Sequence, residues 1–237
     1  VTITFGGGGF FTADSIHTHK DLTIDNTSGL NGSLGAQVVS ASGVTVNLGS
    51  GSGNAVFSSI TASTFTLTGT MRGDALTITS ASVSGAVNID MNGTGSIAIG
   101  AIQSSAAVTI NAHLGNDGSN NETFSADLIS ASGIAITLTG GSGVFTGSVL
   151  TSDAGFTFNS EASIQQGAAA AQHLISSISA SAATITLGAG DNMSASSIQT
   201  TVNADIVMTG SAHFTNAFFS SDGVLSVTQH GGGDVNF

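Results

Sequence analysis

VVSASGVTVNLGSGSG, residues Val38–Gly53, contains no charged side chain and ends in a run of glycine and serine. Its central part, VTVNL, alternates apolar and polar residues, the pattern of a strand with one buried face. The SAS before it and the GSGSG after it supply small residues that suit bends. The stretch therefore predicts a strand between two corners, and copies of it elsewhere indicate a repeated unit.

Copies occur along the whole chain. Taking Val44 as an anchor, we place equivalent apolar residues at Val1, Leu22, Phe65, Val87, Val108, Ile134, Phe156, Ala183, Ala204 and Leu225. The successive spacings are 21, 22, 21, 22, 21, 26, 22, 27, 21 and 21 residues. The two long spacings contain insertions, GNDGSNNE at 115–122 and GAAAAQ at 167–172. The other eight spacings agree within one residue, so the chain is a tandem repeat of 21–22 residues.

Each repeat is expected to hold three short strands with turns. A second apolar column precedes the anchor by about six residues: Ile16, Val38, Ile102, Leu128, Leu150, Ile198 and Phe219. A third follows the anchor: Leu34, Val56, Leu76, Ile97, Val144 and Phe214. Ser or Thr stands four residues before most anchors: Thr18, Ser40, Thr61, Ser104, Ser130, Ser152, Ser179, Thr200 and Ser221.

One repeat cannot bury its apolar face alone, but stacked repeats can, because equivalent strands then pair in parallel. The sequence predicts an all-β fold, a single-stranded parallel β-helix (β-solenoid) of 10–11 coils of 21–22 residues over residues 1–237. At ~4.8 Å per coil the rod is roughly 50 Å long. Because a coil exceeds the ~18 residues of three hexapeptides, we favour a right-handed, triangular or flattened winding.

Two polar columns flank the anchor strand. One residue after the anchor stand Thr2, Thr23, Thr45, Thr66, Asn88, Thr109, Ala135, Thr157, Thr184, Asp205 and Ser226. Three residues after it stand Thr4, Asp25, Asn47, Thr68, Asp90, Asn111, Thr137, Asn159, Thr186, Val207 and Thr228. We name these columns row 1 and row 2 of the ladder face, an outer surface with members ~4.8 Å apart.

Two interpretations of the ladder face stay open. Thr is a good strand former, and stacked Asn and Thr side chains hydrogen-bond along a solenoid, which is a structural role and the favoured one. Regular Thr rows also resemble the flat face of ice-binding solenoids, so a recognition face for ice, a mineral, a polysaccharide or a neighbouring copy is the alternative. Asp25, Asp90 and Val207 interrupt the uniformity of row 2.

Charge excludes several partners. The 237 residues carry 2 Lys+Arg against 14 Asp+Glu, a formal net charge of -12. Such a chain cannot neutralise phosphates, which argues against nucleic acid and against anionic membranes. No apolar run approaches the ~18 residues of a membrane span. The chain has no Cys, so neither a disulfide nor a thiolate site is expected.

The sequence contains only weak candidates for metal ligands. GAGDNMSAS (188–196) and GGGDVNF (231–237) approach the calcium nonapeptide but do not recur in tandem. The loop NDGSNNETFSAD could hold one Ca²⁺ through Asp117, Asn121 or Glu122, although a solvated loop explains it better. His17 and His19 lie two apart without an evident third ligand. We expect no cofactor, with calcium as the only one worth testing.

An enzyme is not expected. β-Helix glycosidases need clustered carboxylates, a cation and aromatic rings in a groove. Here Lys20 and Arg72 are the only cations, and Trp and Tyr are absent. A carbohydrate-active β-helix enzyme therefore remains a remote alternative.

Three segments carry a resemblance: SASGVTVNLGSGSG, SASGIAITLTGGSG and SASAATITLGAG. They resemble the Ser/Thr/Ala/Gly-rich β-strand repeats of large bacterial surface proteins, such as RTX-type adhesins, filamentous-haemagglutinin-like solenoids and S-layer proteins. The resemblance implies an extracellular or cell-surface structural role in a fibre, adhesin or lattice, as a segment of a longer chain or a fibre subunit. The expected partners are copies of the chain or flanking repeats at the end coils, with surface glycans as a further candidate.

Overall fold

The computed structural model describes residues 1–4, 10–26, 33–51, 54–114, 123–140, 144–161 and 171–237. Across these residues the chain forms strands and no helix, and every strand pairing is parallel. The strands are β1 (Thr2–Thr4), β2 (Phe11–His17), β3 (Leu22–Asn26), β4 (Leu34–Gly51), β5 (Ala55–Val83), β6 (Val87–Ser104), β7 (Ala107–Leu114), β8 (Thr123–Ala131), β9 (Gly133–Thr139), β10 (Val144–Glu161), β11 (Gln172–Leu187), β12 (Asn192–Thr209), β13 (His213–Ser221), β14 (Leu225–His230) and β15 (Val235–Asn236).

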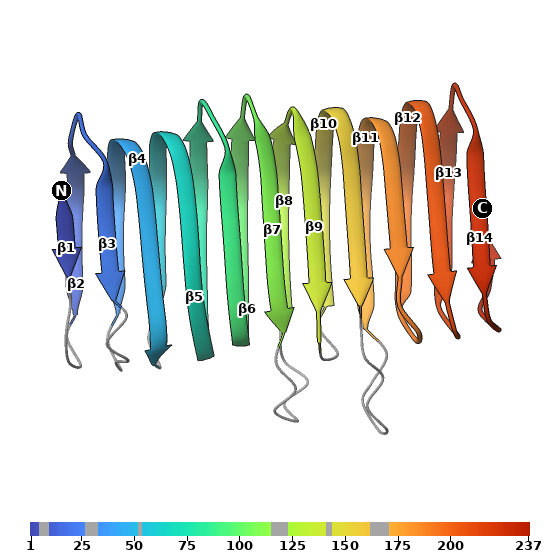
Figure 1. Cartoon of the computed structure of the whole chain (residues 1–237), viewed down its shortest axis with the longest axis horizontal. Coiled ribbons are helices and arrows are strands. Elements are labelled where there is room, and N and C mark those ends of the chain that lie inside the picture. Colours follow the sequence, from blue (N-terminus) through green and yellow to red (C-terminus); the bar gives the residue numbers. More distant parts are fainter. Residues whose placement is uncertain (5–9, 27–32, 52–53, 115–122, 141–143, 162–170) are drawn as a thin grey trace.

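The strands wind into a rod. In Figure 1 the near strands run downward, the far strands run upward, and the chain advances from left to right, so the solenoid is right-handed. We call the near side, which carries the anchors, the front wall, and the far side the back wall. Long strands such as β4 and β12 continue around the upper corner and belong to both walls. The predicted all-β, right-handed parallel β-solenoid is confirmed.

The anchors stack as the repeat predicts. Val44 pairs with Leu22 on one side and Phe65 on the other, and Phe65 pairs with Val87. The same register continues through Val108, Ile134, Phe156, Ala183 and Ala204 to Leu225. From Leu22 to Ala204 every anchor is buried, which gives the rod an unbroken apolar column.

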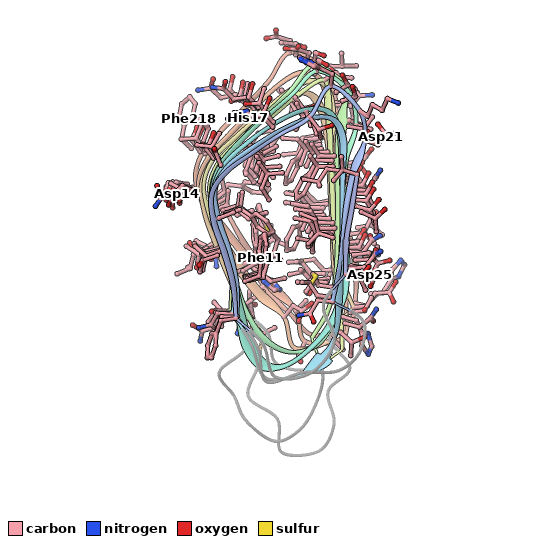
Figure 2. The ribbon with its side chains drawn as sticks, turned by 90° about the vertical axis from the view of Figure 1, so that its left-hand side faces the viewer. Phe11, Asp14, His17, Asp21, Asp25 and Phe218 are labelled. Atoms are coloured by element: carbon pink, nitrogen blue, oxygen red, sulfur yellow. The ribbon has the colours of Figure 1, made fainter. Side chains whose placement is uncertain are left out.

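The cross-section is flattened. Figure 2 looks along the rod: Asp14 and Phe218 project outward from the back wall, Asp25 projects from the front wall, and Phe11 points into the space between. Apolar columns from the two walls fill that space, and the buried phenylalanines include Phe57, Phe65, Phe124, Phe145, Phe156, Phe158 and Phe214. Burial of this continuous core stabilises each winding against its neighbours.

The back wall bends once in each winding. Because of this bend, some residues predicted for the second apolar column do not point inward. Two consecutive residues face outward there, so the alternation resumes one residue later. Val38 is 37% exposed, whereas Val39 is buried and pairs with Ile16 and Ile60. Leu128 is likewise half-buried, and Ile129 takes the inner position. The predictions for Val38 and Leu128 were therefore wrong by one residue.

The third apolar column needs the same correction at two places. Val56 is exposed and Val144 half-buried, while their neighbours Ala55 and Phe145 are buried. Ala55 pairs with Leu34, and Phe145 pairs with Phe124, so these residues continue the column. In both repeats two apolar residues stand next to each other, and only one of them can point into the core. The register places Ala55 and Phe145 inward, and not Val56 and Val144, which the sequence pattern predicted.

The upper corner does not contain one Ser/Thr column. Ser152 and Thr200 are buried in an inner row that also contains Ala131 and Ala180, whereas Thr61 is exposed in an outer row. A winding of 22 residues has one residue more at the corner than a winding of 21 residues. Counting four residues back from each anchor therefore reaches the inner row in some windings and the outer row in others. Pairing accordingly shifts register there, for example between Ser152 and Gly155.

One insertion boundary also moves. Gln172 already belongs to β11 and pairs with Asn192, so it is not part of the insertion predicted at 167–172. The insertion predicted at 115–122 lies outside the described residues.

Candidate functional site: the ladder face

The ladder face lies on the outside of the front wall. Row 1 is one continuous register: Thr2, Thr23, Thr45, Thr66, Asn88, Thr109, Ala135, Thr157, Thr184, Asp205 and Ser226. Row 2 follows the same pairings: Thr4, Asp25, Asn47, Thr68, Asp90, Asn111, Thr137, Asn159, Thr186, Val207 and Thr228. Within the described chain each row thus has eleven members, one per winding.

The side chains of both rows are half-buried or exposed, while the residues between them point into the core. Thr66, for example, lies between the buried Phe65 and Leu67. The period-2 geometry of a strand produces this arrangement, because successive side chains alternate between the two faces of a wall. The ladder face is therefore held rigid by the core directly beneath it.

Hydrogen bonds connect some members along the rod axis. The Thr68 hydroxyl donates to Oδ1 of Asn47 at 2.9 Å, across one winding. Within a single strand, Nδ2 of Asn159 donates to Oε1 of Glu161 at 3.2 Å. Such contacts orient the amide and hydroxyl groups of the ladder face.

A third outward row was missed at the level of sequence. It lies five residues after the anchor, and its described members include Thr70, Asn92, His113, Thr139 and Glu161. Nδ1 of His113 lies 2.8 Å from Oγ1 of Thr139. The signal was present, because the alternation of the anchor strand simply continues for two more residues. This row widens the polar surface at the lower edge of the front wall.

The back wall offers a different outer surface. It exposes the large apolar residues Val38, Val56, Val149, Leu174 and Phe218. Among the described members of rows 1 and 2, Val207 is the only large apolar residue, and it is half-buried. The uniform polar surface of the rod is therefore the front one.

Two shallow depressions lie on the back wall. One, of about 330 Å³, includes Thr12, Gly35 and Val56; the other, of about 300 Å³, includes Leu174, Ser194 and Thr215. Both sit between outward side chains of adjacent windings, where small residues leave space. Neither depression involves rows 1 and 2 of the ladder face.

The metal candidates of the sequence are the loop with Asp117 and Glu122 and the pair His17 and His19. Asp117 and Glu122 lie outside the described residues. His17 and His19 are both exposed, and Figure 2 places His17 and Asp21 on opposite sides of the upper corner. Among the described residues, no group of three His, Asp or Glu side chains has the arrangement of a metal site.

One titratable side chain lies in the core instead of on a face. His173 is 1% exposed and occupies an inner column between Phe145 and Met193. Its Nε2 lies 3.0 Å from the hydroxyl of Ser160, and its ring meets Phe158 edge-on at 5.1 Å. Burial away from water lowers the pKa of His173 to about 4, because the charged imidazolium is the form that desolvation penalises.

Comparison with protein-family models, with curated proteins and with solved structures finds no match in any of the three. No described helix has the length and apolarity needed to span a bilayer. The features that bear on the function of the chain are therefore those of its own geometry.

Proposed function

We propose that the chain is a non-enzymatic structural β-solenoid of an extracellular surface fibre, adhesin or lattice. The observation that carries the proposal is the unbroken stack: row 1 keeps its register through eleven windings of the described chain. Such a stack is a rigid spacer of roughly 48 Å, at ~4.8 Å for each of the ten steps.

The direction of the hydrogen bonds suits this role. In a parallel solenoid the backbone hydrogen bonds between windings run along the rod axis, so tension applied to the ends loads many of them together. Between β5 and β6 alone, the register extends from Phe65 and Val87 to Val83 and Ser104. A rod of this kind can separate a binding tip from a cell surface without a large globular core.

The end windings supply surfaces for further stacking. Val1 and Phe10 are exposed in the first winding, and Val224, Leu225 and Val227 are exposed in the last. Leu225 continues the anchor column beyond the buried Ala204, so its exposed side chain is available to another winding. We propose that this winding is supplied by flanking repeats of the same polypeptide or by another copy of the chain.

The mass of the native polypeptide and electron microscopy test this proposal together. We expect either a polypeptide larger than the 23.1 kDa of this chain with further windings, or filaments built from the 23.1 kDa chain. Antibodies against the chain should label intact cells that produce it. Native 23.1 kDa monomers that form no filaments, or labelling only after cell lysis, contradict the proposal.

A matched pair of variants tests assembly by copies. L225K/V227K places two charges on the apolar end column, whereas T228K places one on the outer surface of the same strand. If copies stack, sedimentation should show that the first variant loses filaments while T228K retains them. Filaments that survive L225K/V227K would require another contact.

A second candidate function is supported by the ladder face, a binding surface for a neutral polysaccharide or ice. Rows 1 and 2 expose hydroxyl and amide groups in register, and their charges are the acidic Asp25, Asp90 and Asp205. An uncharged ligand that offers repeated hydrogen-bonding groups fits this surface better than an anionic polymer.

The test compares two triple variants for co-sedimentation with cellulose, with chitin and with ice. T45K/T66K/T109K disrupts row 1, and T12K/T77K/T146K changes the outside of the back wall by the same number of charges. A roughly tenfold weaker binding of the first variant alone supports a binding face, since ~1.4 kcal/mol is tenfold in affinity. Equal binding by both variants, or no binding by the unmodified chain to any of the three materials, rejects it.

A further inference from the structure

Two inner columns face each other at the lower part of the winding. The column on the back wall includes Leu34, Ala55, Ile97, Phe124, Phe145, His173, Met193 and Phe214. The column on the front wall includes Leu48, Gly69, Met91, Ala112, Leu138, Ser160, Leu187 and Met208. His173 and Ser160 are the polar members of these runs and lie opposite each other.

Only part of the hydrogen-bonding capacity of His173 is satisfied. Nε2 contacts Oγ of Ser160 at 3.0 Å, but Nδ1 is buried and has no hydrogen-bond partner among the described residues. The rest of the surroundings is apolar: Phe158 lies against the ring, and Phe145 and Met193 flank it in the column. A neutral imidazole tolerates this site better than an imidazolium, which must donate two hydrogen bonds.

We propose that the winding in which His173 faces Ser160 is an acid-sensitive joint, which opens locally when His173 gains a proton while more distant windings stay closed. A buried charge with one unsatisfied N–H destabilises its immediate surroundings. Each winding contacts only its neighbours, so the cheapest opening is local and does not require the whole rod to unfold.

Several titratable side chains lie in or next to this winding. Asp191, in the next winding, is buried, and its Oδ2 accepts the N–H of Gly188 at 2.9 Å. Glu161 is exposed beside Ser160, and His213 is exposed and lies 3.4 Å from Asp234. The cause of the lowered pKa of His173 is its burial.

The pH range follows from the sign of the shift. The pKa of His173 is lowered from 6.5 to about 4, so the open state binds more protons than the closed state between these values. The joint is therefore stable above pH 6.5 and loses stability as the pH falls towards 4. If opening fully hydrates the ring, the population of the open state rises by roughly 50-fold between pH 7 and pH 4.5.

A single introduced cysteine can report on local opening, because the chain has no Cys of its own. A195C places a thiol at a buried position two residues after Met193, the register partner of His173. A126C is the matched control, since Ala126 is buried in the same inner column, three windings away through Gly147 and Ile175. The rate of reaction with 4,4'-dithiodipyridine is measured for both thiols at pH 7 and pH 4.5, and their ratio cancels the intrinsic pH dependence of the reagent.

We expect the ratio of the Ala195→Cys rate to the Ala126→Cys rate to rise by tens-fold at pH 4.5, and to stay constant when His173 is replaced by Phe. If the larger phenylalanine ring of His173→Phe prevents folding, His173→Met is measured instead, because Met193 occupies the same column. The proposal is wrong if the ratio does not change with pH or if the reaction rates of both thiols rise together at pH 4.5. It is also wrong if the ratio still rises in the variant that lacks His173.

Discussion

Thr68 and Asn47 are register partners in adjacent windings, and the Thr68 hydroxyl donates to the Asn47 side-chain oxygen at 2.9 Å. The bond therefore runs along the rod axis on the outer surface of the front wall. When the chain unfolds, the hydroxyl and the amide oxygen form hydrogen bonds to water instead. The net contribution of this exposed hydrogen bond to stability is therefore small. The polar ladder orders the surface, whereas the core beneath it stabilises the rod.

This division of roles predicts different costs for two adjacent residues. Thr68→Val keeps the β-branched shape and removes the hydroxyl, so we expect it to lower the free energy of unfolding by less than about 1 kcal/mol. Leu67→Ala, one residue earlier, truncates a fully buried side chain and should cost about 2–5 kcal/mol. Urea unfolding followed by circular dichroism measures both, and equal costs would show that the ladder is itself a main source of stability.

The bend of the back wall predicts an asymmetry between two neighbouring valines. Val39→Asp buries a carboxylate in the core without a partner, so we expect loss of the cooperative fold or destabilisation by more than about 4 kcal/mol. Val38→Asp changes an outward side chain and should leave circular dichroism unchanged, with a stability change of about 0.5 kcal/mol or less. The reverse order would place Val38 inside and return the register to the one that the sequence suggested.

Two glycines of the back wall differ in the space around them. A Cβ added at Gly100 lies 2.4 Å from the carbonyl oxygen of Thr79, so Gly100→Ala must displace backbone. We expect a cost of about 1–3 kcal/mol. A Cβ at Gly35 meets nothing closer than 3.7 Å, so Gly35→Ala should be neutral or stabilise by up to about 1 kcal/mol through the unfolded state. Thermal unfolding of the two variants side by side checks the prediction.

His173 predicts a specific pH dependence of global stability. Its pKa is lowered to about 4 by burial, so the unfolded chain binds the extra proton first as the pH falls. The His173 contribution is fully present above pH 6.5 and decreases between pH 6.5 and 4, by about 3 kcal/mol in all. The urea midpoint of His173→Phe should accordingly fall less over this range than that of the unmodified chain.

The exposed His19 provides the control for that measurement. His19→Ala removes an imidazole from an exposed position and leaves His173 in place, so it measures how much a His substitution outside the core changes the pH curve. Parallel curves for His173→Phe and the unmodified chain would mean that the buried imidazole does not set the acid sensitivity.

Some features of the candidate site were predictable and others were not. The outward position of Thr45 and Asn47 followed from strict alternation around the buried Val44 and Val46. The outward row containing His113 required the same alternation to be extended by two residues. The core position of His173 could not be read in this way, because the insertion before it hides the register that equates it with Phe145.

The sequence by itself determined the winding: anchors recurring every 21–22 residues and alternating with polar residues can bury their apolar side chains only by stacking in parallel. Only the tertiary structure decided which member of an adjacent pair, such as Val38 and Val39, points inward. The physical reason is that a bend places two consecutive residues outside and resets the alternation, and the position of that reset depends on packing against the neighbouring windings and not on the local pattern.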